Sequence, residues 1–151
     1  MHLDPATGWI QFGDDDSTID ELENIRAECR AHADVLNLWW FIYSHHEQWD
    51  ACLDIASAIV KMAPDRVWGW IHKAISLRRS NGGGFENAKA LLLEAAKLFP
   101  GDSMIQYNLA CYCAQLGQLD AAQEYLDKSY ELGDAKQIKL MALDDDDLKP
   151  L

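Results

Sequence analysis

Apolar residues recur along most of this chain at the spacing of amphipathic helices, and the predicted helices come in pairs. Three stretches, beginning near Ala33, Val67 and Ser103, each contain an apolar helix, a short polar turn and a second amphipathic helix. The second stretch begins 34 residues after the first (33 to 67), and the third begins 36 residues after the second (67 to 103). This period predicts an all-α protein built from repeated helical hairpins.

Small and aromatic residues fall at matching positions in these hairpins. The middle hairpin has an aromatic residue, three alanines and a closing proline, at Trp70, Ala74, Ala88, Ala95 and Pro100. The last hairpin has a comparable set at Leu109, Ala110, Gly117, Ala122 and Ser129. Two helices cross closely only where side chains are short, so these positions predict the seams between helices.

With these residues at this period, the chain resembles the tetratricopeptide repeat (TPR) family, whose repeat is a helix–turn–helix. The stretches GWIHKA, YNLACYCAQLG and KLMALDDDDL are similar to a set of small bacterial TPR proteins of unassigned function. The resemblance implies a TPR helical-hairpin solenoid, coiled as a right-handed superhelix, with about three full repeats. The first hairpin departs from the family pattern, because Trp40 stands where a small residue is usual.

We expect residues 1–151 to form a single TPR domain. Its predicted parts are a degenerate repeat at 4–32, repeats at 33–66, 67–102 and 103–134, a capping helix at 135–143 and an acidic tail at 144–151. Solenoids need a terminal helix with a polar outer face to close the last repeat, and we assign that role to 135–143. The run of four aspartates that follows is expected to be a solvated end.

Composition limits the classes of partner. The chain has 13 Lys and Arg against 25 Asp and Glu, which gives a formal net charge of −12. Nucleic acids and anionic membranes are poor partners for such a surface, because affinity for them comes largely from neutralised phosphates. No membrane-length apolar run and no signal peptide are visible. The four cysteines are therefore expected to be reduced thiols in a cytoplasmic protein.

Two of the cysteines, Cys111 and Cys113, are the first candidates for chemistry. Residues two apart on a helix point to roughly opposite sides, so the two thiols do not form a metal or redox pair. The repeat phase places Cys113 in the seam between helices and Cys111 on the inner, concave face. An accessible Cys111 would leave open a thiol-based redox sensor, which requires a depressed thiol pKa.

Other motifs carry no catalytic signature. HHEQWD at 45–50 lacks the second histidine of a zinc protease site and falls at a predicted turn. GDDDS at 13–17 and DDDD at 144–147 lack the alternation of a calcium loop. NGGGFEN lacks the lysine of a phosphate-binding loop. We expect no enzyme activity, no metal and no cofactor.

The resemblance to TPR proteins implies a groove lined by the first helix of each hairpin. Its candidate lining residues are Asn37, Phe41, Trp68, Ile71, His72, Ile75, Arg78, Arg79, Met104, Tyr107, Asn108 and Cys111. Aromatic anchors mixed with a few polar groups are typical of a surface that binds a peptide or a protein segment. The expected function is therefore non-enzymatic protein–protein interaction. The alternative is a homodimer in which the outer face around Trp39 and Trp40 pairs with a second copy.

Overall fold

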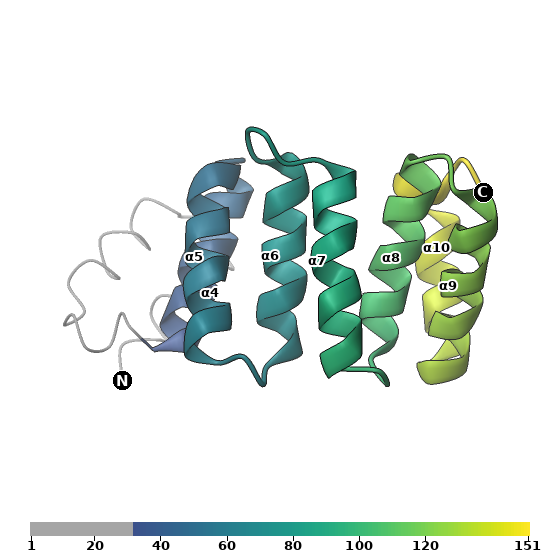
Figure 1. The fold of residues 1–151 in the computed structure, drawn as a ribbon, viewed down its shortest axis with the longest axis horizontal. Helices are drawn as coiled ribbons and strands as arrows, with labels where there is room; N and C mark the ends of the chain where they lie inside the picture. Colours follow the sequence, from purple (N-terminus) through teal and green to yellow (C-terminus); the bar gives the residue numbers. More distant parts are fainter. Residues whose placement is uncertain (1–31) are drawn as a thin grey trace.

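The structure is a computed structural model of the 151-residue chain, and it describes residues 32–151. These residues form α4 (Ala33–His45), α5 (Trp49–Met62), α6 (Val67–Arg79), α7 (Phe85–Leu98), α8 (Ser103–Gln115), α9 (Leu119–Leu132), α10 (Ala135–Leu143) and the 3-10 helix η1 (Asp146–Leu148). From α5 to α9 the helices follow one another along the long axis of the molecule, while α4 packs on α5 and α10 packs on α9 (Figure 1). Residues 32–151 contain no β-strand, so the expected all-α class is confirmed. The degenerate repeat at 4–32 and the GDDDS run fall outside the described residues, apart from residue 32.

Polar caps and glycine turns set the ends of the helices. Asp102 and Asp134 accept hydrogen bonds from the backbone N–H of Ile105 and Gln137, and so satisfy free donors in the first turns of α8 and α10. Gly117 has φ of 77° in the turn between α8 and α9, a conformation that other residues rarely adopt. These residues fix the starts of α8 and α10 and the turn between α8 and α9.

Small side chains fill the seams between the helices. Ala74, Ala88, Ala110 and Ala122 are all fully buried. Gly69 brings α6 close to α5, because a Cβ at this position would lie 2.8 Å from Cγ2 of Ile59. Interiors packed this closely tolerate little added volume. The short residues therefore set the spacing of the helices.

Trp40, the departure from the repeat pattern, packs onto the neighbouring hairpin. Its indole Nε1 donates a 2.8 Å hydrogen bond to the buried hydroxyl of Ser76 on α6. Its ring stacks on His72, with 3.9 Å between the ring centroids. The bulky side chain thus joins α4 to α6. It lies inside the protein, so the structure contradicts the expectation that Trp40 forms an outer face for a second copy.

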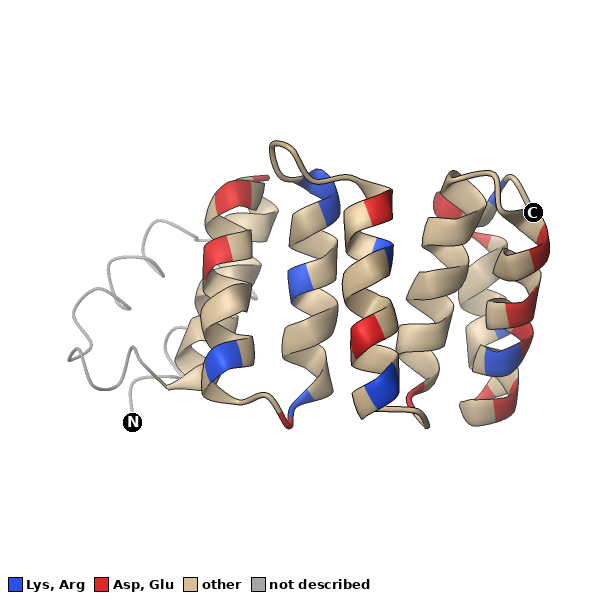
Figure 2. Ribbon diagram, viewed as in Figure 1, with Lys and Arg blue, Asp and Glu red and all other residues tan. Residues whose placement is uncertain are grey.

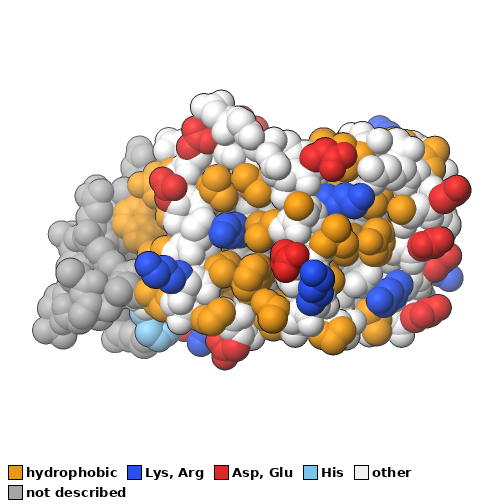
Figure 3. Space-filling model, viewed as in Figure 1, with side chains coloured by type: hydrophobic (Ala, Val, Ile, Leu, Met, Phe, Trp, Pro, Cys, Tyr) orange, Lys and Arg blue, Asp and Glu red, His pale blue; other side chains and the backbone are white. Residues whose placement is uncertain are grey.

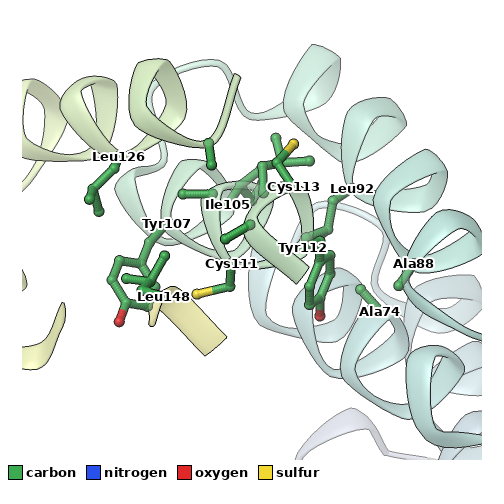
Figure 4. Close-up of a cluster of buried hydrophobic side chains, with 14 of the residues drawn as sticks. Ala74, Ala88, Leu92, Ile105, Tyr107, Cys111, Tyr112, Cys113, Leu126 and Leu148 are labelled. Atoms are coloured by element: carbon green, nitrogen blue, oxygen red, sulfur yellow. The ribbon is translucent and has the colours of Figure 1, made fainter. Parts of the chain in front are cut away.

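The main hydrophobic core surrounds α8 (Figure 4). From Ile105 to Ala114, every residue of this helix except Asn108 is buried. α7 packs on one side and α9 on another, while η1 covers part of the remaining surface. Burial on so many sides explains why the pattern of α8 is apolar nearly all round. Residues on this helix that face the groove are consequently not all open to a partner.

The last helix, α10, closes the core only in part. Ile138 is buried against it, but Leu140 and Leu143 are exposed, Leu143 by 81%. These leucines, with Lys136, Lys139 and others, line a hollow of about 570 Å³ between α9 and α10. The expected polar outer face is therefore wrong in part, because apolar and basic side chains alternate along this short helix. Within residues 32–151, no helix has both the length and the apolar character to cross a bilayer.

Candidate functional site: a groove with an occupant

The predicted groove residues lie on α4, α6 and α8, the first helix of each hairpin. At the α4–α6 end the structure brings three of them together. Phe41 meets His72 edge-on at 5.3 Å between ring centroids, and Trp68 lies 5.9 Å from His72. Phe41 is 44% exposed, whereas His72 and Trp68 are half-buried. We call Phe41, Trp68 and His72 the aromatic cluster.

Four other predicted residues contribute less surface. Ile71 and Ile75 pack against the buried cores, so only part of each side chain faces the groove. Asn108 donates a 2.8 Å hydrogen bond to the carbonyl of Met104 in its own helix. Asn37 is half-buried on α4, while Met104 is exposed. Among the predicted groove residues, Phe41 and Met104 are therefore the exposed large apolar side chains.

The adjacent Arg78 and Arg79 have different surroundings. The guanidinium of Arg78 lies over the adjacent rings of Phe85 and Tyr112, and it is 3.5 Å from a carboxylate oxygen of Asp147. Arg79 lies over the ring of Trp49, 4.7 Å from its centroid. Arg78 is therefore a fixed positive group inside the groove. Arg79 packs at the turn between α4 and α5, where it also lines a hollow with Asp50 and Asn81.

The residues after α10 occupy the α6–α8 end of the groove. We call residues 144–151 the acidic segment. Asp145 accepts a 2.6 Å hydrogen bond from the phenol of Tyr107, and the backbone carbonyl of Asp147 accepts one of 2.9 Å from Gln115. Leu148 is only 6% exposed and joins the core around α8. The expectation of a solvated acidic end is therefore wrong in part, because Asp145, Asp147 and Leu148 contact α6 and α8 while Asp144 and Asp146 stay exposed.

This arrangement corrects the interpretation of Tyr107 and Cys111 as open groove residues. Both are buried beneath the acidic segment, and Cys111 is 3% exposed. Its thiol lies 3.7 Å from the same Asp145 oxygen that Tyr107 contacts. Burial, together with the charges of Asp145 and Asp147, raises the pKa of the Cys111 thiol. A redox sensor requires an accessible thiol of lowered pKa, so the structure contradicts the basis of that alternative.

Cys111 and Cys113 point to different sides of α8, as the helical spacing predicts. Figure 4 shows Cys111 directed toward Tyr107 and Leu148, while Cys113 lies on the other side of the helix. Cys113 is fully buried, and burial raises the pKa of its thiol. The two cysteines therefore act as small core residues.

The remaining motifs lie in turns. His45 ends α4, and the turn before Trp49 contains Glu47 with φ of 56°. NGGG joins α6 to α7, and Gly83 approaches the carbonyl of Leu77 so closely that a Cβ would clash with it. In the described part of the chain, no group of three or more His, Cys, Asp and Glu side chains is placed to hold a metal ion.

Sequence reasoning missed the residues of the acidic segment that enter the groove. The sequence predicts a solvated end at these residues, because a run of like charges is usually solvated. The available signal was Leu148, an apolar residue directly after that run. Because the four residues of DDDD are identical, the sequence does not indicate which carboxylates make contacts and which stay exposed.

Charge is distributed unevenly over the outer surface. α9 carries Asp120, Glu124, Asp127 and Glu131 at helical spacing. Figure 2 shows acidic positions in red along this end of the molecule. On the face drawn in Figure 3, apolar side chains are interspersed with single charges of both signs. That face has no continuous basic patch of the kind that binds polyanions.

Comparison with known proteins identifies the fold. No family model matches the sequence, and no curated protein matches it. Solved structures of MamA are similar. MamA 41-end from Desulfovibrio magneticus RS-1 is 14% identical with a TM-score of 0.70, over 98% of this chain and 85% of that chain. MamA MSR-1 is 18% identical with a TM-score of 0.68, over 87% of this chain and 74% of that chain. The chain therefore has the TPR-like helical-hairpin solenoid fold that the sequence predicts.

Proposed function

We propose that this protein is a non-enzymatic interaction module whose concave groove binds a peptide or protein segment. The observation that carries the proposal is the aromatic cluster, in which Phe41 is exposed beside Trp68 and His72. Exposed aromatic residues flanked by polar groups are typical anchors of protein interfaces. Helical solenoids provide the extended concave surface on which such anchors act.

The rest of the groove supports the same function. Met104 adds an exposed flexible apolar side chain on α8, which suits an adaptable contact. Arg78 supplies a positive charge fixed by its contacts with Phe85 and Tyr112. The proposed partner is a protein, with neither nucleic acid nor membrane, because the chain has a net charge of −12.

Site-specific photocrosslinking in cells tests the proposal. A photoreactive residue placed at position 41 is expected to give discrete adducts with a partner, and Met104→Ala in the same chain is expected to reduce them. Position 98 on α7 is the matched control, because Leu98 is an exposed apolar residue on a second helix of a hairpin. Equal adducts at 41 and 98, or none at 41, would overturn the proposal.

A further inference from the structure

The contacts of the acidic segment follow a regular pattern on α8. Tyr107, Cys111 and Gln115 are spaced four residues apart and therefore share one face of the helix. All three meet the acidic segment, Tyr107 and Cys111 at Asp145 and Gln115 at the carbonyl of Asp147. One helix face thus binds one short stretch of chain along its length.

An ion pair and a buried leucine add to the contact between the acidic segment and α8. Arg78 reaches across from α6 to Asp147, and its side chain is only 13% exposed. Leu148 follows directly and enters the core beside Leu126 and Tyr107 (Figure 4). Two carboxylates that meet a phenol and a guanidinium, followed by a buried leucine, form a complete set of recognition contacts.

The other two aspartates of the run border the groove but are exposed and do not contact Tyr107, Gln115 or Arg78. Asp144 and Asp146 are exposed, and Asp146 pairs with Lys149 inside the segment itself. The groove therefore selects alternate residues of DDDD. General attraction of acid to base does not explain this, because the chain is acidic overall and repels the run on average.

The segment is held at few points and is exposed at many. Of its eight residues only Leu148 is buried, and Lys149, Pro150 and Leu151 are exposed. Arg78, Arg79 and Met141 line a hollow of about 640 Å³ together with residues 144–147, so this part of the groove is not completely filled. A segment bound in this way competes for the groove as a tethered ligand, at an effective concentration set by its short tether.

We propose that the acidic segment is a built-in competitor, and that the partner bound at the α6–α8 end carries the same pattern. That pattern is two carboxylates separated by one residue, with a large apolar residue directly after the second. The partner segment displaces residues 144–151 and makes the same contacts with Tyr107, Gln115 and Arg78. This inference rests on the proposed function and names the chemistry of the partner segment.

The test uses the full chain and a labelled peptide with the sequence of residues 142–150, measured by fluorescence anisotropy. The triple variant Asp145→Asn, Asp147→Asn, Leu148→Ala removes the contacts that hold the acidic segment. We expect this variant to bind the peptide at least tenfold more tightly than the wild type does. Adding Arg78→Gln to the triple variant is expected to reduce that binding about tenfold.

The matched control is Asp144→Asn, Asp146→Asn with Leu148 retained. It changes the net charge equally but leaves the groove contacts in place. This variant is expected to bind the peptide as weakly as the wild type. Equal tightening in both variants would make the effect one of net charge and would overturn the proposal, as would no tightening in the triple variant.

Hydrogen exchange on the wild-type chain keeps the proposal testable if the triple variant does not fold. Excess peptide is expected to accelerate amide exchange in residues 144–151 while α8 stays protected. Unchanged exchange in 144–151 at saturating peptide would overturn the inference. Crosslinking at position 41 together with no peptide effect would overturn this inference and leave the proposed function standing. Peptide binding without any partner crosslinked at 41 would overturn the proposed function, and with it the partner named here, and would leave only the competition between the peptide and the acidic segment.

Discussion

The indole of Trp40 and the imidazole of His72 lie face to face, 3.9 Å apart between centroids and inclined by 7°. The stack joins the first helix of one hairpin to the first helix of the next. It also covers one face of the half-buried His72, and burial lowers the pKa of His72 to about 4. The neutral imidazole is therefore the form that the folded protein holds.

We predict a loss of stability in mild acid that depends on His72. The pKa in the folded protein, about 4, lies below the ordinary value of 6.5. As the pH falls, the imidazole is therefore protonated in the unfolded chain before it is protonated in the folded protein. The stability that the neutral imidazole contributes is fully present above about pH 6.5 and is lost as the pH falls toward 4. Urea unfolding is measured at pH 7 and pH 4.5 for the wild type and for His72→Asn. Between these pH values, the free energy of unfolding of the wild type is expected to fall by on the order of 2 kcal/mol more than that of His72→Asn. An identical pH dependence in the two proteins would contradict the prediction.

A second prediction concerns the hydrogen bond between Trp40 and Ser76. Ser76→Ala leaves the buried indole N–H without its acceptor, which is expected to cost about 1–3 kcal/mol in the free energy of unfolding. Ser44→Ala is the matched control, because the Ser44 hydroxyl bonds a carbonyl of its own helix and is half-buried. Thermal and urea unfolding measure the stability of Ser76→Ala and of Ser44→Ala. A loss no larger than that of Ser44→Ala would show that the bond adds no stability.

A third prediction concerns thiol reactivity. In a Cys29→Ser background, Cys52, Cys111 and Cys113 report on the described part of the chain, and all three are buried. Burial raises the pKa of each thiol, that of Cys52 to about 11, so little reactive thiolate is present at pH 8. Labelling with a thiol-specific reagent is expected to be at least tenfold slower than in the urea-unfolded chain.

The variant without the Asp145, Asp147 and Leu148 contacts is expected to label faster at Cys111 alone. Cys113 serves as the internal control, because it lies in the seam and does not contact the acidic segment. Peptide mapping after labelling distinguishes the two sites. Rapid labelling of Cys111 in the intact protein would contradict the burial that the structure shows.

The helical hairpins were predictable because their information is local. Helical periodicity, cap residues and small side chains act within one hairpin, and Ala74, Ala88 and Ala110 lie in the seams that the repeat phase predicts. Trp40 was less predictable, since its partners His72 and Ser76 lie in the next hairpin. A pattern within one repeat does not reveal a contact between repeats.

The site was predictable only in outline. The groove helices followed from the repeat phase, but which residues remain open depends on contacts distant in the sequence. Tyr107 and Asp145 are separated by 38 residues, and nothing in either neighbourhood indicates their 2.6 Å hydrogen bond. Arg78 and Arg79 are adjacent and alike in sequence, and their roles differ because Arg78 contacts Phe85 and Asp147 whereas Arg79 lies over Trp49.

A fourth prediction tests the close approach of α5 and α6 at Gly69. Alanine here places a Cβ 2.8 Å from Cγ2 of Ile59, which is fully buried and cannot move away easily. Overpacking of this kind costs about 1–3 kcal/mol, and the better helix propensity of alanine returns up to about 1 kcal/mol. Gly69→Ala is therefore expected to lower the free energy of unfolding by about 1 kcal/mol.

Gly101→Ala is the control for this substitution, because a Cβ at Gly101 would meet no atom within 4 Å. It is expected to leave stability unchanged or to raise it slightly, since alanine restricts the unfolded chain. Urea unfolding measures both variants. If Gly69→Ala is as stable as Gly101→Ala, the α5–α6 contact can accommodate a Cβ 2.8 Å from Cγ2 of Ile59, and the prediction is contradicted.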